Sequence, residues 1–174
     1  MAEILHVWAL APAAIGTCCL AADGRRARAR VPELVASALM LLAMVDAAGP
    51  GWVAPVYSAA LLLLAAMALA ALRGARRGRH RRRTRAELAM TVHAAVGLVV
   101  MAALMLGMGH ASGVSGAHVH GPSAATVTVL FLAGGAAYAL WSTWEAVRAH
   151  SALGRLQFGA MGATTLAMAL AGVI

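Results

Sequence analysis

The side chains with the clearest metal chemistry gather in one stretch of this chain, residues 93–120. The stretch holds four of the seven histidines and three of the ten methionines. Its first part is an apolar segment in which helical periodicity brings His93 and the three thioethers within about 120° of one another. Its second part is a Gly-rich loop that contains no arginine and carries the sequence AHVHG. Thioether and imidazole groups are ligands that suit copper, and methionine favours Cu(I).

A second apolar segment repeats the i, i+4 spacing of two methionines, and we predict that the two segments face each other. Small neighbours on both segments, such as Ala36 and Ala102, would permit a close approach. The thioethers would then bind Cu(I), and the loop imidazoles would capture the ion. Core packing is the alternative interpretation, because methionine commonly fills gaps between apolar helices. The predicted metal ligands are Met40, Met44, His93, Met101, Met105, Met108, His110, His118 and His120.

His93 lies about two turns inside its apolar segment, where polar groups in membrane proteins usually serve a function. A metal ligand, a proton-relay group and a hydrogen bond to a neighbouring helix all remain open interpretations. A haem with two histidine ligands is not expected, since no other histidine lies in the middle of an apolar segment. Hydrolase, kinase, metalloprotease and phosphate-loop motifs are absent from the sequence, so we do not expect an enzyme.

The composition predicts an integral membrane protein. Of the 174 residues 62% are hydrophobic and only 11% are charged, whereas soluble domains are about half apolar and about a quarter charged. Six apolar segments are long enough, or nearly so, to cross a hydrocarbon core of about 30 Å as helices. We therefore predict an all-α bundle of six transmembrane helices in a single unit, residues 1–174. The predicted spans are residues 4–22, 31–48, 52–72, 87–108, 124–144 and 156–174.

The distribution of arginine predicts the orientation. The first, third and fifth connections carry four, eight and two arginines, which account for all fourteen basic residues. The positive-inside rule places these connections in the cytoplasm and both termini outside. Trp8 and Trp52 would then lie at the outer interface, and Trp141 and Trp144 at the inner one. The basic run RGARRGRHRRRTR has no interleaved aromatic residues to stack on bases, so no nucleic-acid partner is expected.

The segments LMLLAM and HAAVGLVVMAALMLGM, together with the loop HASGVSGAHVHG, resemble an uncharacterised family of small polytopic membrane proteins. The family occurs in high-GC Gram-positive bacteria, and the resemblance covers essentially the whole chain. It implies paired methionines in the second helix, a histidine followed by spaced methionines in the fourth, and a variable His-rich outer loop. It also implies the bacterial cytoplasmic (inner) membrane, which the chain would cross several times. No activity follows from it.

Copper binding or handling at the outer face is therefore the predicted function, with the lipid bilayer as the surroundings. The alternative is a structural or assembly subunit of a larger membrane complex without a metal role, supported by the compact chain and by small-residue helix faces. A third interpretation is a copper permease whose inner path uses Cys18, Cys19, Met67 and Met90. The chain could act in this way as a homo-oligomer.

Overall fold

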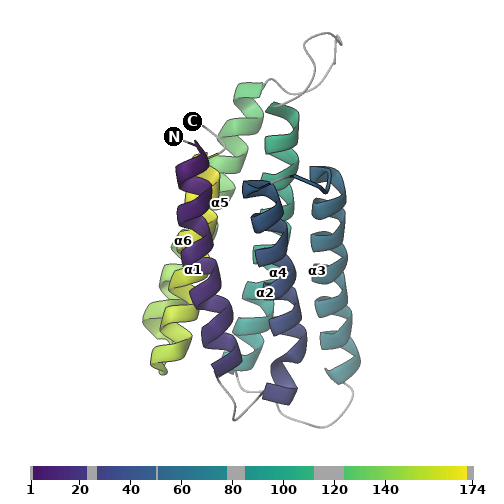
Figure 1. Ribbon diagram of the computed structural model, residues 1–174. Helices are drawn as coiled ribbons and strands as arrows, with labels where there is room; N and C mark the ends of the chain where they lie inside the picture. The colour runs from purple at the N-terminus through teal and green to yellow at the C-terminus, as the bar shows by residue number, and fades with distance from the viewer. Residues whose placement is uncertain (1, 23–26, 50, 78–84, 112–123, 172–174) are drawn as a thin grey trace.

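Six α-helices stand side by side in an up-and-down bundle in the computed structural model of the chain (Figure 1). The structure describes residues 2–22, 27–49, 51–77, 85–111 and 124–171. The helices are α1 (Ala2–Ala22), α2 (Ala27–Ala48), α3 (Pro55–Arg77), α4 (Arg85–Ala111), α5 (Ala124–Arg148) and α6 (Ala152–Ala171). The predicted all-α architecture with six helices is thus confirmed.

The predicted ends of the helices differ from the observed ends at the polar boundaries. Helix α3 begins at Pro55 rather than at residue 52, because the preceding residues form the turn from α2. Proline suits the first position of a helix, where its missing N–H needs no partner. Helices α2, α3 and α5 extend beyond their apolar spans into arginine-bearing sequence. Long arginine side chains reach water from such positions, so a polar residue does not have to end the helix.

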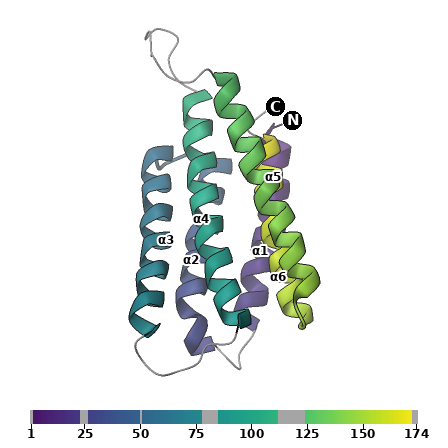
Figure 2. The ribbon, with the colours of Figure 1, turned by 180° about the vertical axis from the view of Figure 1, so that it is seen from behind.

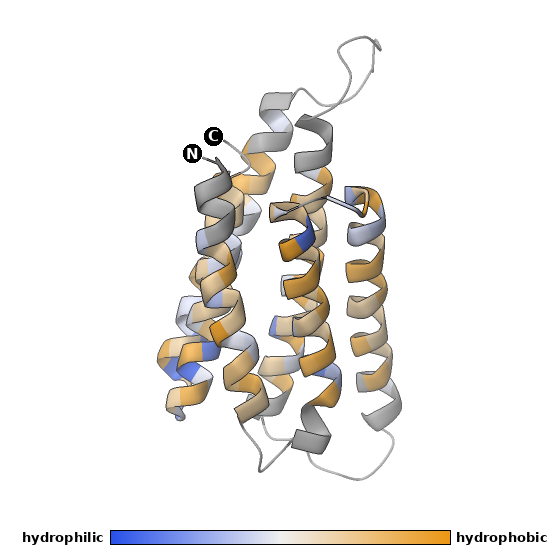
Figure 3. Cartoon of the chain, viewed as in Figure 1, coloured by the Kyte–Doolittle hydropathy of each residue, from blue (hydrophilic) through white to orange (hydrophobic). Residues whose placement is uncertain are grey.

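Within the residues that the structure describes, three helices are long and apolar enough to cross a membrane, over the spans Val31–Ala48, Pro55–Leu72 and Leu88–Gly107. Helix α1 contains a shorter apolar segment, Trp8–Ala22. Hydrophobic residues make up much of the helices, as the colours of Figure 3 show. Several of them are exposed on the outside of the bundle, including Leu42 and Leu64. Such an apolar outer surface indicates contact with a lipid bilayer.

Helix α4 is the central element of the bundle. It packs against α2, α3, α5 and α6, and 56% of its apolar span is buried, against 28% for the spans of α2 and α3. Helix α6 packs against α1 and α5 on the other side of the molecule, which Figure 2 shows from behind. Residues on α4 therefore reach most of the core.

Close packing between α5 and α6 depends on two glycines, as their small faces led us to expect. A Cβ atom at Gly135 would lie 2.8 Å from the Cβ of Ala169, and one at Gly162 would lie 2.8 Å from the Cβ of Ser142. The missing side chains thus let the two backbones approach each other. The hydroxyl of Thr165 donates to the carbonyl of Met161 in its own helix, which satisfies this buried polar group.

The alternating helix directions bring the ends of α1, α3 and α5, which lead into the arginine-bearing sequence, to one end of the bundle, and the start of α1 and the end of α6 to the other (Figure 1). At the arginine-bearing end, the guanidinium of Arg148 lies 4.2 Å from the centroid of the Trp144 ring. The exposed aromatic ring and the cation form an arrangement typical of a membrane interface. Trp8 and Trp52, which are also exposed, lie toward the opposite end.

Candidate functional site

Six methionines are buried in one hydrophobic core, and five of them, from three helices, are the most deeply buried. Each of these five has an exposed fraction of 4% or less. We predicted that the methionines of α2 and α4 face each other, which requires them to point into the bundle rather than toward lipid. Their burial agrees with this requirement. The five are Met40 and Met44 on α2, Met101 and Met105 on α4, and Met168 on α6. We call them the methionine cluster.

Small residues are buried in the same core as the methionine cluster. Ala36 and Ala43 on α2 and Ala102 on α4 are buried in the same core. Because alanine adds little bulk, the helices that carry the methionines can pack closely at this depth. Met168 was not predicted to join these methionines, because periodicity reveals the face of a helix but not which other helices that face meets.

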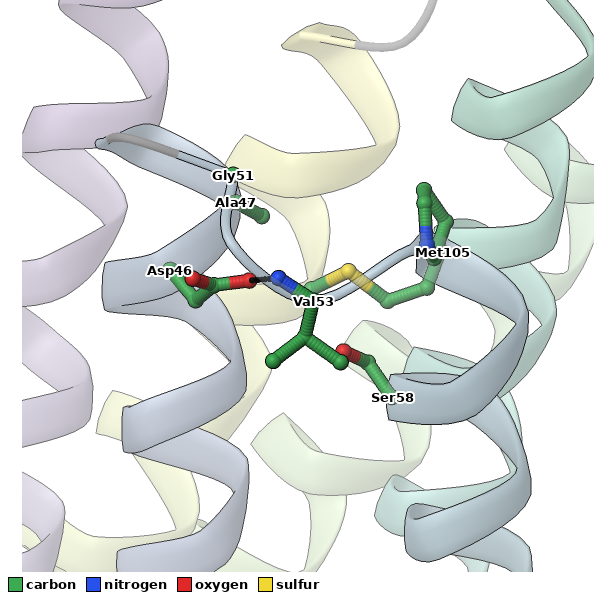
Figure 4. Close-up of a pocket in the computed structure, with 7 residues that line it drawn as sticks. Asp46, Ala47, Gly51, Val53, Ser58 and Met105 are labelled. Carbon is green, nitrogen blue, oxygen red and sulfur yellow. Dashed lines mark hydrogen bonds between the residues drawn. The ribbon is translucent and has the colours of Figure 1, made fainter.

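A small pocket of about 180 Å³ lies beside the methionine cluster, where the turn between α2 and α3 passes over α4. The thioether of Met105 reaches this pocket from α4, and the carboxylate of Asp46 lines it from α2, as Figure 4 shows. Ser58 on α3 contributes a hydroxyl. The remaining lining residues are Ala47, Gly51, Val53 and Pro55. The pocket thus combines a soft ligand with a negative charge.

Asp46 is held in place by the turn that it stabilises. Its two carboxylate oxygens accept hydrogen bonds from the backbone N–H groups of Trp52 (3.0 Å) and Val53 (3.1 Å). Gly51 adopts a φ of 60°, a conformation that residues with a side chain rarely take. The sequence DAAGPGW contains the signal for such a turn in its acid and its glycines, but Asp46 was not among the predicted site residues.

His93 belongs to a second cluster, between α4, α5 and α6. It is fully buried, and its Nε2 lies 3.0 Å from the hydroxyl of Tyr138 and 3.4 Å from that of Ser142. Three aromatic rings surround the imidazole, with centroids at 4.8 Å for Tyr138, 4.7 Å for Phe158 and 5.0 Å for Trp141. These contacts agree with the interpretation that His93 forms a hydrogen bond to a neighbouring helix. Trp141 therefore turns partly inward, although it lies near the end predicted to be cytoplasmic.

The hydrogen bonds favour one tautomer of His93. The hydroxyl of Tyr138 lies 3.2 Å from the backbone carbonyl of His93 and has a single hydrogen to donate. If that hydrogen goes to the carbonyl, Nε2–H can donate to the hydroxyl oxygen, and both groups are satisfied. Nδ1 is buried and has no hydrogen-bond partner in the part of the chain that the structure describes. In this tautomer Nδ1 carries no hydrogen, so it is not a buried donor without an acceptor.

The two clusters lie at different depths in the bundle. His93 and Met101 are eight residues apart on α4, which corresponds to about 12 Å along the helix axis. A single ion cannot bind both side chains at that separation, since copper-to-ligand bonds are only about 2 Å long. A metal role for His93 thus stays a prediction, and it would need ligands other than the methionine cluster.

Four predicted ligands remain, and all four belong to the last turn of α4 or to the connection that follows it in sequence. Met108 and His110 lie on α4, and the structure does not describe their side chains. His118 and His120 lie outside the described residues. Of the proposed inner path, Met67 (68% exposed) and Cys18 face away from the core.

Among the residues that the structure describes, no group of three or more His, Cys, Asp and Glu side chains comes together to hold a metal ion. The methionine cluster offers thioethers alone, and metal binding by it stays a prediction. Comparisons of the chain with models of known protein families, with curated proteins and with solved structures find no match.

Proposed function

We propose that this chain is a six-span membrane protein that binds Cu(I) in the methionine cluster, at the half of the bundle facing away from the cytoplasm. The observation that carries the proposal is the burial of five thioethers from three helices in one core. Soft, uncharged sulfur ligands prefer Cu(I) to harder divalent ions. Copper storage or handling at the outer face follows as the function.

The pocket beside Met105 gives the ion an entrance. Copper bound only by thioethers would bring an uncompensated positive charge into a low-dielectric core, which is unfavourable. The carboxylate of Asp46 lines the same pocket as Met105. It supplies a negative charge beside the first thioether that an entering ion meets, and this lowers the electrostatic cost of leaving water.

The loop histidines serve as the capture site in this proposal. His118 and His120 stand two residues apart, a spacing that lets an extended loop chelate Cu(II). The positive-inside rule puts this loop outside, at the same end of the bundle as the pocket. Replacement of these two histidines with alanine should therefore abolish Cu(II) binding and leave Cu(I) binding in the core intact.

The test is copper stoichiometry. The full-length protein is purified in detergent, loaded with Cu(I) without oxygen in the presence of a competing Cu(I) chelator, and analysed for metal. We expect stoichiometric copper in the native protein and its loss in Met101→Leu/Met105→Leu. Leucine conserves volume well enough that the fold should survive, at a cost below about 1.5 kcal/mol per site.

Met67→Leu is the matched control, because it removes the same chemical group from a position outside the core. It should retain all of the copper. X-ray absorption of the loaded protein should show sulfur neighbours around the metal. Copper no higher than background in the native protein would contradict the proposal, as would equal copper in Met101→Leu/Met105→Leu. Co-purification with other membrane subunits would then favour the assembly-subunit alternative.

A further inference from the structure

A buried carboxyl group lies deep in the bundle, on the same helix as Met40 and Met44 but toward the arginine-bearing end. Glu33 on α2 is 5% exposed, and its Oε1 accepts a hydrogen bond of 2.8 Å from the hydroxyl of Thr91 on α4. Its Oε2 is also buried and has no hydrogen-bond partner among the described residues. One carboxyl oxygen is therefore satisfied, and the other is not.

No described positive group compensates a charge at this position. Helix α2 packs against α1, α3 and α4. The titratable side chains that the structure describes on these three helices are Cys18, Cys19, Tyr57 and His93, and Asp46 lies on α2 itself. None of them forms a hydrogen bond or an ion pair with Glu33, and His93 is bonded to Tyr138 and Ser142 instead.

Among the described side chains, an ionised Glu33 would thus have no positive partner. Buried charges are normally paired, because the loss of hydration is otherwise too costly. A proton on Oε2 removes the charge and leaves Oε1 as the carbonyl oxygen of a carboxylic acid. A carbonyl oxygen is a suitable acceptor for the hydroxyl of Thr91.

We propose that Glu33 is a proton-binding site inside the bundle, with an exchangeable proton on Oε2. Glu33 is six residues from the start of α2 at Ala27, about 9 Å along the axis, so the arginine-bearing end is the nearer route for exchange. The assignment rests on Glu33 and its surroundings and does not depend on copper binding.

The site is continuous with the methionine cluster along α2. Glu33, Ser37, Met40 and Met44 fall within about 60° of one another around the helix, and all four are buried. On α4, Thr91 and Met105 fall on one face in the same way. The interface of α2 with α4 thus has an oxygen-bearing end at Glu33 and a sulfur-bearing end at the pocket.

Carbodiimide modification tests the proposal. A lipid-soluble carbodiimide adds to a protonated carboxyl group in an apolar setting and forms a stable N-acylurea. The full-length protein in liposomes is treated with dicyclohexylcarbodiimide, and the modified residue is identified by mass spectrometry. We expect Glu33 to be modified, and we expect Glu33→Gln to lose this modification.

A comparison of the modification yield with and without sodium distinguishes a bound proton from another bound monovalent cation. Sodium chloride and choline chloride at equal concentration should leave the yield the same if the occupant is a proton. Protection by sodium alone would overturn the assignment of the proton and replace it with a metal cation. Thr91→Ser keeps the donor to Oε1 and should stay near the native yield, whereas Thr91→Val removes it and should change the yield.

Infrared spectroscopy provides a measurement that does not depend on access of the reagent. The native protein should show the carbonyl stretch of a protonated carboxylic acid, and the band should shift in D2O and be absent from Glu33→Gln. A band that does not shift in D2O would overturn the claim that the proton exchanges. Loss of the band together with absence of modification would show an ionised Glu33 and overturn the proposal.

Discussion

The imidazole of His93 derives its position from one hydroxyl group more than from any other. Tyr138 contacts both Nε2 and the backbone carbonyl of His93, at 3.0 and 3.2 Å. Tyr138→Phe keeps the stacked ring and removes the hydroxyl, which leaves buried polar atoms with fewer partners. We expect a loss of about 1–3 kcal/mol in the free energy of unfolding, measured by thermal unfolding in detergent.

Ser142→Ala is the comparison for this prediction. Its hydroxyl lies 3.4 Å from Nε2, a distance at which a hydrogen bond is weak. The stability loss should therefore be smaller than that of Tyr138→Phe. Equal losses in the two variants would contradict the view that Tyr138 is the main partner of His93.

At this scale the sequence predicts which residues are buried better than what they contact. The i, i+4 spacing of Met40 with Met44 and of Met101 with Met105 was sufficient to place all four in the interior. The partners of His93 were not predictable in the same way. Tyr138 and Ser142 lie 45 and 49 residues away in sequence, and only the packing of α4 against α5 brings them to the imidazole.

The contact between α4 and α5 depends on the absence of a side chain at Gly97. A Cβ atom there would lie 2.5 Å from the Tyr138 hydroxyl oxygen and 3.3 Å from the terminal methyl of Met161. Gly97→Ala should therefore push α5 and α6 away from α4. We expect a loss of about 1–3 kcal/mol in the free energy of unfolding, the usual cost of overpacking a core.

Gly134→Ala is a matched control for Gly97→Ala, since a Cβ atom at Gly134 meets nothing within 4 Å. Alanine favours a helix over glycine by up to about 1 kcal/mol, so this variant should be neutral or stabilising. Both variants are compared by thermal unfolding in the same detergent. A Gly97→Ala protein as stable as the native one would contradict the close approach of Tyr138.

The turn between α2 and α3 depends on a single carboxylate. Asp46→Ala removes the acceptor for the N–H groups of Trp52 and Val53. Hydrogen exchange should become faster at these two amides, while exchange within the middle of α3 should stay unchanged. Asp46→Asn, which keeps one side-chain oxygen, should give an intermediate effect. Unchanged exchange in Asp46→Ala would contradict the capping role.

The positions of the helices along the chain can be predicted from hydropathy, because helices that cross lipid need long apolar segments. All six predicted segments are helical in the structure. Their ends are less predictable. The helical hydrogen bonds of α2 and α5 continue past the apolar residues into sequence that hydropathy assigns to connections. Ends are set by local backbone partners, such as the carboxylate of Asp46, rather than by mean hydropathy.

The neighbours of each helix are a property of the whole molecule that the sequence leaves open. An up-and-down order makes consecutive helices antiparallel, but it does not specify that α6 packs between α1 and α5 or that α4 contacts four other helices. Small residues at Gly135 and Gly162 indicate close packing without naming the partner helix. The contact between α2 and α4 was predicted only from their similar methionine spacing, and the structure shows that these two helices pack against each other.

The orientation of the bundle across the membrane is testable with two exposed positions at opposite ends. Trp52 follows α2 and is 86% exposed, and His150 lies in the exposed connection between α5 and α6. Each is changed to cysteine in a Cys18→Ser/Cys19→Ser background, because Cys18 is itself exposed. The positive-inside rule places the arginine-bearing end in the cytoplasm. A membrane-impermeant maleimide should therefore label Trp52→Cys in intact spheroplasts and His150→Cys only after the membrane is permeabilised. The reverse pattern would move the Asp46 pocket to the cytoplasmic side, and the proposed copper site would then face the cytoplasm.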